Sequence, residues 1–195
     1  MPGRLPYWSR RNKRAAVAAA IAAMVCAGAT FARAQSAGAS PPAARAVVAA
    51  AVKKAAAEKK VVLVEFGASW CTWCRSFDAF VHAPGTAKIL ADNFVVTNLT
   101  VQERGDKKPL ENPGGEELMT EWDGLDAGLP FYVFLNATGG KIADSNVMKD
   151  GSNVGFPGTP EEVDAFMGLM QATAPRLTPA NGAALRTYLT KAIKP

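Results

Sequence analysis

Two cysteines separated by two residues, Cys71 and Cys74, are the side chains in this sequence best suited to chemistry. They lie in the segment Trp-Cys-Thr-Trp-Cys, where a disulfide closed across one helical turn can also be reopened. If a helix begins at Cys71, its unpaired N–H groups and the positive end of its dipole favour the thiolate over the thiol. The spacing therefore predicts that Cys71, at an exposed helix start, attacks a disulfide and that Cys74, one turn later, resolves the product.

Other uses of these cysteines fit the sequence less well. A static disulfide over so short a loop would restrain the unfolded chain little. A zinc site would lack a fourth ligand, and Arg75 stands where a Cys-x-x-Cys-His motif needs histidine for haem attachment. The single histidine, His82, lies about three helical turns after Cys71 and is expected to interact with the helix dipole. We expect no metal and no cofactor.

The residues on either side of the cysteines predict the elements that hold them. Residues 61–66 form an apolar run of strand length, and Phe77, Phe80 and Val81 recur at helical spacing over residues 71–82. A strand that leads into Cys-x-x-Cys at the start of a helix is typical of a redox βαβ unit. Glu65 falls within the apolar run, where a buried acid is costly unless it has a partner or a task. The alternative is an ion-paired or edge-facing side chain.

The rest of the chain continues this alternation of strands and helices. An alanine-rich amphipathic helix precedes the first strand, and a capping box at Thr159-Pro160-Glu161-Glu162 starts a late helix. The other predicted elements are a short helix at 86–91, a parallel strand at 94–101, a loop at 102–115, a short helix at 116–122, a hairpin of strands 131–136 and 141–145, and a last helix from Pro179 with Leu185, Leu189 and Ile193 inward. The pattern predicts an α/β fold, a three-layer sandwich whose central mixed sheet of about four strands has helices on both faces.

Two segments of the sequence resemble the thioredoxin superfamily. Glu-Phe-Gly-Ala-Ser-Trp-Cys at residues 65–71 is similar to the family's approach to its active site, and Gly128-Leu129-Pro130 before an aromatic strand is similar to its cis-proline segment. The resemblance covers roughly residues 45–173. It is strongest to the periplasmic and secreted branch, which includes the C-terminal domain of the Dsb electron-transfer protein.

The resemblance implies a thiol-disulfide oxidoreductase with a redox-active Cys71–Cys74 disulfide. It places Glu65 where the family keeps a buried carboxylate, which would handle the proton of Cys74, and it implies a cis bond between Leu129 and Pro130. Leu129 and Pro130 would then line the client-binding groove. Trp70 and Trp73 beside the cysteines are further candidates for client binding, with Trp73 the more exposed tryptophan; the alternative is that both only cover the start of the helix. Its partners would be protein thiols and disulfides of exported proteins and a redox partner protein, and it would act as a monomer. The alternative is a binding or chaperone-like module that uses the charged loop at 102–115.

The charge distribution points to export. The net charge is +5, but residues 1–34 hold six of the 22 basic residues and no acid, which leaves 16 basic and 17 acidic residues and a net charge of −1. No nucleic-acid partner is therefore expected. The cationic start, the apolar stretch and Ala32-Arg33-Ala34 predict a signal peptide over 1–34, with a flexible linker at 35–44 and one domain over 45–195 that carries an extra C-terminal helix. The alternative is an uncleaved anchor, which would attach the protein to the membrane.

The cleavage site gives the first testable prediction. We expect the mature protein to begin near Gln35 and to be periplasmic or secreted, because Ala32-Arg33-Ala34 fits a small-x-small cleavage site. The intact mass of the exported protein measures this directly. Recovery of a membrane-bound species that retains Met1 to Ala34 would support the anchor instead.

Overall fold

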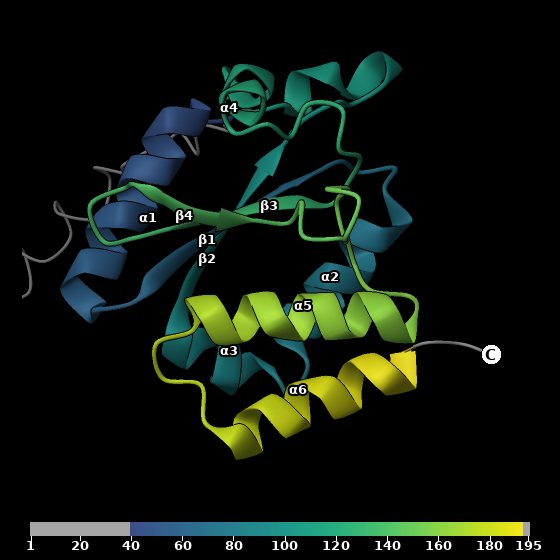
Figure 1. The fold of residues 1–195 in the computed structure, drawn as a ribbon. Helices are drawn as coiled ribbons and strands as arrows, with labels where there is room; N and C mark the ends of the chain where they lie inside the picture. Colours follow the sequence, from purple (N-terminus) through teal and green to yellow (C-terminus); the bar gives the residue numbers. More distant parts are fainter. Residues whose placement is uncertain (1–39, 193–195) are drawn as a thin grey trace, which may run out of the picture. The chain divides into compact units, whose positions relative to one another are not determined.

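A four-stranded mixed sheet forms the centre of the computed structural model, which describes residues 40–192 (Figure 1). The predicted signal peptide lies outside these residues. The strands are β1 (Val61–Gly67), β2 (Phe94–Thr100), β3 (Phe131–Leu135) and β4 (Lys141–Asp144). Their order is β2-β1-β3-β4; β1 and β2 are parallel, whereas β1–β3 and β3–β4 are antiparallel. The predicted parallel pair and the predicted hairpin are both confirmed.

Helices cover both faces of the sheet, which confirms the predicted three-layer α/β arrangement (Figure 1). Helices α1 and α4 pack on one face, and α2, α3 and α5 lie on the other, with α6 against α5. Their bounds are α1 Ala44–Glu58, α2 Thr72–His82, α3 Ala87–Asn93, α4 Gly115–Glu121, α5 Pro160–Thr173 and α6 Pro179–Ala192. The segment predicted as a loop at 102–115 contains a 3-10 helix, Gly105–Leu110.

Side chains alternate along β1 between two cores. Val62, Val64 and Phe66 join the apolar cluster under α1 and α4, while Leu63 joins the cluster under α2 and α5. Because side chains of a strand alternate between faces, Glu65 lies on the same face as Leu63 and therefore under α2. The alternation thus directs an acidic side chain into the layer that carries the cysteines.

Two proline-started helices complete the cysteine-bearing face. Thr159 caps α5 as predicted, because its hydroxyl accepts the N–H of Glu162 and the Glu162 carboxylate accepts the N–H of Thr159. Leu185 and Leu189 of α6 are buried against this layer as predicted, whereas Ile193 lies outside the described residues.

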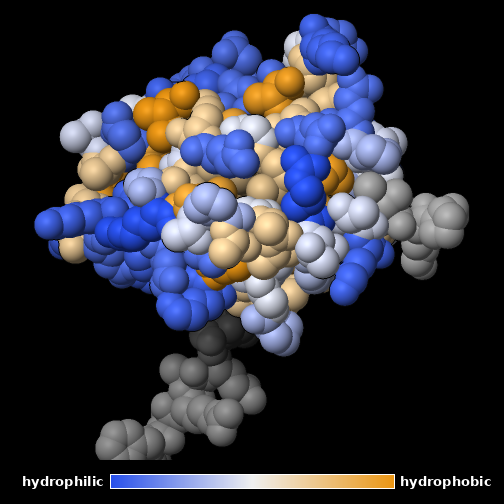
Figure 2. All heavy atoms as spheres, turned by 60° about the horizontal axis from the view of Figure 1, so that its bottom comes forward, coloured by the Kyte–Doolittle hydropathy of each residue, from blue (hydrophilic) through white to orange (hydrophobic). Residues whose placement is uncertain are grey.

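The outer surface of this layer is mixed in character. Figure 2 brings forward the side at the bottom of Figure 1, where α3 and α6 lie; hydrophilic residues cover most of its outline, with apolar residues in small groups between them. Among residues 40–192, no helix has both the length and the apolar character needed to cross a bilayer.

Candidate active site

Cys71 and Cys74 are joined by a disulfide at the start of α2. Cys71 is the N-cap residue, and its Sγ accepts the backbone N–H of Cys74 at 3.0 Å. The expectation of an exposed Cys71 is wrong for this disulfide form, since Cys71 is 3% exposed and Cys74 is 7% exposed. Ala68 and Leu129 pack against the two cysteines.

A buried carboxyl lies beneath the disulfide. Glu65 is 2% exposed, which confirms its predicted burial, and it makes no ion pair with any described residue. Its register partner on β2 is Asn98, whose Nδ2 donates to Glu65 Oε2 at 2.6 Å. Burial raises the pKa of Glu65 to about 8, helped by the negative charge of Asp78 and opposed by the hydrogen bond from Asn98.

Gly67 leaves a space between this carboxyl and Cys74. A Cβ atom at Gly67 would lie 3.4 Å from Cys74 Sγ and 3.5 Å from Glu65 Oε1. Asn98 binds Oε2, so Oε1 is the oxygen on the cysteine side. The space opens into a cavity of about 220 Å³ that Glu65, Gly67 and Cys74 line together with Ala68, Arg75, Asp78, Asn98, Leu99 and Thr100. A water molecule would fit there and could relay a proton between the two groups.

Charged and aromatic side chains surround the start of α2. Arg75 Nη1 donates to the carbonyls of Ser69 at 3.2 Å and Cys71 at 3.4 Å. Trp73 is 55% exposed and stacks on Phe156, whereas Trp70 is 39% exposed and donates its indole N–H to the carbonyl of Gln102. Trp73 is thus the more exposed tryptophan, as predicted.

The Leu129–Pro130 peptide bond is cis, as the resemblance implies. Leu129 packs against the cysteine cluster, so this segment does lie beside Cys71. Within residues 40–192, neither the N–H nor the C=O of Leu129 has an intramolecular hydrogen-bond partner. Asn153 holds the segment in place, because its Nδ2 donates to the carbonyls of Ala127 at 3.1 Å and Pro130 at 3.0 Å.

Sequence reasoning missed three polar residues at this site, Asn98, Glu103 and Asn153. Glu103 is 2% exposed, and its carboxylate accepts the Ser69 N–H at 2.6 Å and the Ser69 hydroxyl at 2.9 Å. All three act on segments more than 20 residues away in the chain. The only local signal is a polar residue within an apolar stretch, which Asn98 offers in β2.

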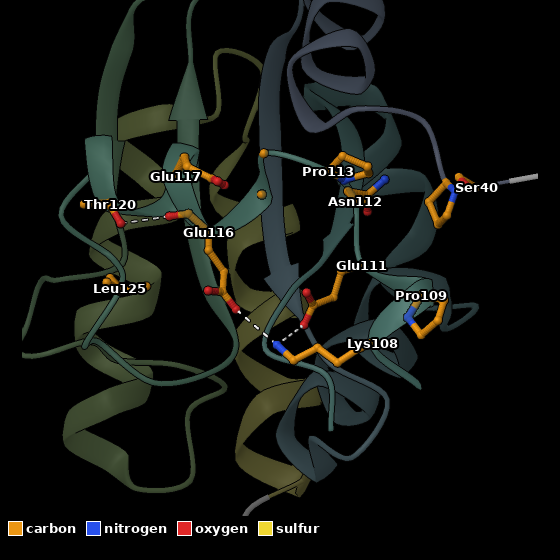
Figure 3. A pocket seen from close by; sticks show the side chains of 13 residues that line it. Ser40, Lys108, Pro109, Glu111, Asn112, Pro113, Glu116, Glu117, Thr120 and Leu125 are labelled. Atoms are coloured by element: carbon orange, nitrogen blue, oxygen red, sulfur yellow. Dashed lines mark hydrogen bonds and ion pairs between the residues drawn. The ribbon is translucent and has the colours of Figure 1, made fainter. Parts of the chain in front are cut away.

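A larger cavity of about 620 Å³ lies apart from the cysteines, at the segment predicted as a charged loop (Figure 3). Lys108 points toward Glu111 at 2.9 Å and Glu116 at 3.9 Å across it. His82, the last residue of α2, is paired with Asp78 at 3.1 Å instead of with a cysteine. In the described part of the chain, no three His, Cys, Asp or Glu side chains are grouped as metal ligands.

Comparison with known protein families matches this site to one of them. The family model described as Thioredoxin-like matches residues 43–137, which include both cysteines, Glu65 and Pro130. The fold of this part of the chain is thioredoxin-like. The match begins close to the predicted start at residue 45, while the resemblance read from the sequence extends further, to about residue 173. A comparison with curated proteins found no match.

Several solved structures are similar to part of this chain. A disulphide isomerase from Xylella fastidiosa Temecula1 has 20% identity and a TM-score of 0.46, over 77% of this chain and 92% of that one. A thioredoxin from Thermus thermophilus has 20% identity and a TM-score of 0.41, over 68% and 87%. The oxidised C-terminal domain of DsbD from Neisseria meningitidis has 21% identity and a TM-score of 0.38, over 53% and 84%.

The raised pKa of Glu65 predicts how stability depends on pH. Between the ordinary pKa of 4.5 and the folded value of about 8, the folded protein holds a proton that the unfolded chain has released. The free energy of unfolding should therefore fall as pH rises through this window, by up to about 1.4 kcal/mol per pH unit. In Glu65→Gln this dependence should disappear. Urea unfolding at about pH 5 and about pH 8.5 measures it.

The matched control is Glu117→Gln, which removes an exposed carboxylate on α4. It should keep the wild-type pH dependence. If Glu65→Gln loses stability between the two pH values as steeply as the wild type, Glu65 is ionised in the fold and its assigned pKa is wrong.

Proposed function

We propose that this protein is an exported thiol-disulfide oxidoreductase that exchanges disulfides with protein clients. The observation that carries the proposal is the Cys71–Cys74 disulfide at the start of α2, directly over the buried Glu65. Export rests on the cationic and apolar leader with its small-x-small site. A dithiol form and a disulfide form of this pair would alternate as electrons pass between a client and a redox partner.

In the reducing direction, Cys71 is the attacking sulfur. The Cys74 N–H points at Cys71 Sγ, and Arg75 lies within hydrogen-bond distance of the Cys71 carbonyl, so both favour the thiolate. The thiolate forms a bond to one client sulfur, and the client's S–S bond breaks. The other client sulfur leaves as a thiolate and takes a proton from water.

Cys74 then resolves the mixed disulfide. Its thiol loses a proton, and its sulfur bonds to Cys71 as the Cys71–client bond breaks, so the client leaves with both electrons. Glu65 is the proposed proton acceptor, because Oε1 and Cys74 Sγ border the same space at Gly67 and no histidine is near. Because the pKa of Glu65 is about 8, only its ionised fraction can accept this proton at neutral pH, and that fraction grows as the pH rises.

The reverse proton transfer regenerates the dithiol. A partner thiolate attacks Cys71, and Cys74 leaves as a thiolate. Below about pH 8 Glu65 is mostly protonated in the disulfide form, so it can donate a proton to Cys74 through the same space. One carboxyl thus serves as acid in one direction and as base in the other.

The client would bind beside Leu129. The backbone N–H and C=O of Leu129 have no hydrogen-bond partner within the described residues, so an extended client segment could pair with them as an added strand. The exposed ring of Trp73 and the partly exposed ring of Trp70 flank the cysteines and offer apolar contact. Because Cys71 is nearly buried, side chains such as Leu129 must shift before a client sulfur reaches it.

The second candidate is a binding or chaperone-like module without redox turnover. The cavity of about 620 Å³ next to Lys108 and Glu111 favours it, because this cavity could hold part of a partner. The cysteines separate the two candidates, since a binding module would not need them.

The decisive experiment is reduction of a client disulfide by the protein with a chemical dithiol as electron source. We expect turnover by the wild type, at least a hundred-fold loss in Cys71→Ser because the attacking sulfur is removed, and accumulation of mixed disulfides in Cys74→Ser. Reduction by the wild type that is no faster than by Cys71→Ser or by the dithiol alone would assign the protein to the binding class.

Replacement of Glu65 tests the proton path. Glu65→Gln keeps the shape of the side chain and removes its proton site, so the resolving step should slow by about ten-fold or more, while attack by Cys71 changes less. Stopped-flow kinetics with the two steps separated, over pH 6 to 8, measures both. Resolution as fast as in the wild type would mean that the proton goes directly to water.

Two further variants control this experiment. Glu117→Gln removes an exposed carboxylate on α4 and should leave both steps unchanged. Gly67→Ala keeps every charge but puts a methyl group 3.4 Å from Cys74 Sγ and 3.5 Å from Glu65 Oε1, so it should slow only the resolving step.

A further inference from the structure

Three cations contact the four residues that lead into α2. Arg75 Nη2 donates to Thr72 Oγ1 at 3.0 Å, in addition to its bonds to the carbonyls of Ser69 and Cys71. Lys107 Nζ donates to Ser69 Oγ at 3.1 Å. The guanidinium carbon of Arg104 lies 4.0 Å from the centre of a Trp70 ring. All three side chains belong to exposed residues, and together they border the approach to Cys71.

The segment that carries Arg104 and Lys107 is fixed to the active site by buried bonds. Directly before Arg104, Glu103 accepts two hydrogen bonds from Ser69, and its own N–H donates to Glu111 Oε1 at 2.6 Å. The Gln102 carbonyl accepts the Trp70 indole N–H at 2.8 Å. Arg104 and Lys107 therefore lie against Trp70 and Ser69, the residues that directly precede Cys71.

None of the three cations is in direct contact with a carboxylate in the described part of the chain. Their contacts are to neutral oxygens and an aromatic ring, and within residues 40–192 none of them forms an ion pair. Seven other basic residues do form ion pairs with carboxylates: Arg45, Lys60, Lys88, Lys108, Lys141, Lys149 and Arg186. Three carboxylates lie nearby, Glu103 and Asp106 on the same segment and Asp78 beside Arg75, but none of them forms an ion pair with these cations. The unused N–H donors of the three cations are therefore open to a carboxylate from a client.

We propose that Arg75, Arg104 and Lys107 form a cationic rim that selects client segments with a carboxylate beside the reactive cysteine. This inference rests on the proposed function and names its substrate class. An arginine fork can bind a carboxylate through two parallel bonds, and each of these cations keeps donors that its present contacts do not use. Because the rim is small and the rest of the chain is slightly acidic, it suits a short acidic peptide segment better than a long polyanion.

The test uses three disulfide peptides that differ only in the residues beside the cysteine, which are Glu, Gln or Lys. The full-length protein reduces each with dithiothreitol as the dithiol, and kcat/KM is measured at low and high salt. We expect kcat/KM to be highest for the Glu peptide, lower for the Gln peptide and lowest for the Lys peptide. At low salt the Glu and Lys values should differ by about ten-fold, and the difference should shrink as the salt concentration rises. Equal values for the three peptides would overturn the proposal.

Variants of Arg104 and Lys107 test whether these two residues cause the preference for the Glu peptide. Arg104→Gln with Lys107→Gln should bring the Glu-to-Lys ratio to about one-third of its wild-type value or less, because two of the three charges are lost. Arg104→Lys keeps the charge and should keep the ratio. Lys53→Gln removes an exposed charge on α1, on the opposite face of the sheet, and should also keep it. An unchanged ratio in the double variant would show that the rim does not select clients.

A binding experiment separates failure of the rim from failure of the proposed function. If no peptide is reduced above the dithiothreitol background, the proposed function fails. Peptides with serine in place of cysteine are then titrated against tryptophan fluorescence, to which Trp70 and Trp73 contribute. Tighter binding of the Glu peptide supports the rim even without turnover, whereas equal binding of the Glu and Lys peptides refutes it.

Discussion

The burial of one carboxyl between a strand and the cysteine-bearing helix is the constraint on which this structure depends. Glu65 is directed inward by the same alternation that builds the core, and its only hydrogen-bond partner among the described residues is Asn98 on the neighbouring strand. Desolvation there raises its pKa to about 8. The buried carboxyl therefore lowers the free energy of unfolding at neutral pH, and it places a titratable group beside Cys74.

The helix over this carboxyl is held rigidly by aromatic packing. Phe77 of α2 stacks on Tyr132 at 5.2 Å between ring centres, and Phe80 meets Phe166 of α5 at 5.7 Å. Tyr188 of α6 also reaches Phe80, at 5.4 Å. The two C-terminal helices thus pack against α2, the helix that begins directly after Cys71.

Two segments distant in the chain complete the surroundings of the disulfide. The segment after β2 is tied to the start of α2 through Glu103 and Ser69, and the segment before β3 is held by Asn153. Both ties are hydrogen bonds from buried or partly buried groups, so they are worth more than exposed contacts of the same kind. The approach to Cys71 is therefore bordered by fixed structure on both sides.

The sequence by itself determined the elements and the chemistry of the cysteines. Periodicity of two or 3.6 residues and local caps such as Thr159 depend only on neighbours along the chain, so the strands, the α-helices and the burial of Glu65 were predictable, whereas the 3-10 helix at Gly105–Leu110 was not. Tertiary structure alone decided that Asn98 lies opposite Glu65, that Glu103 binds Ser69 and that Cys71 is covered. Strand register and contacts between distant segments depend on how the whole chain packs, and no short stretch of sequence encodes them.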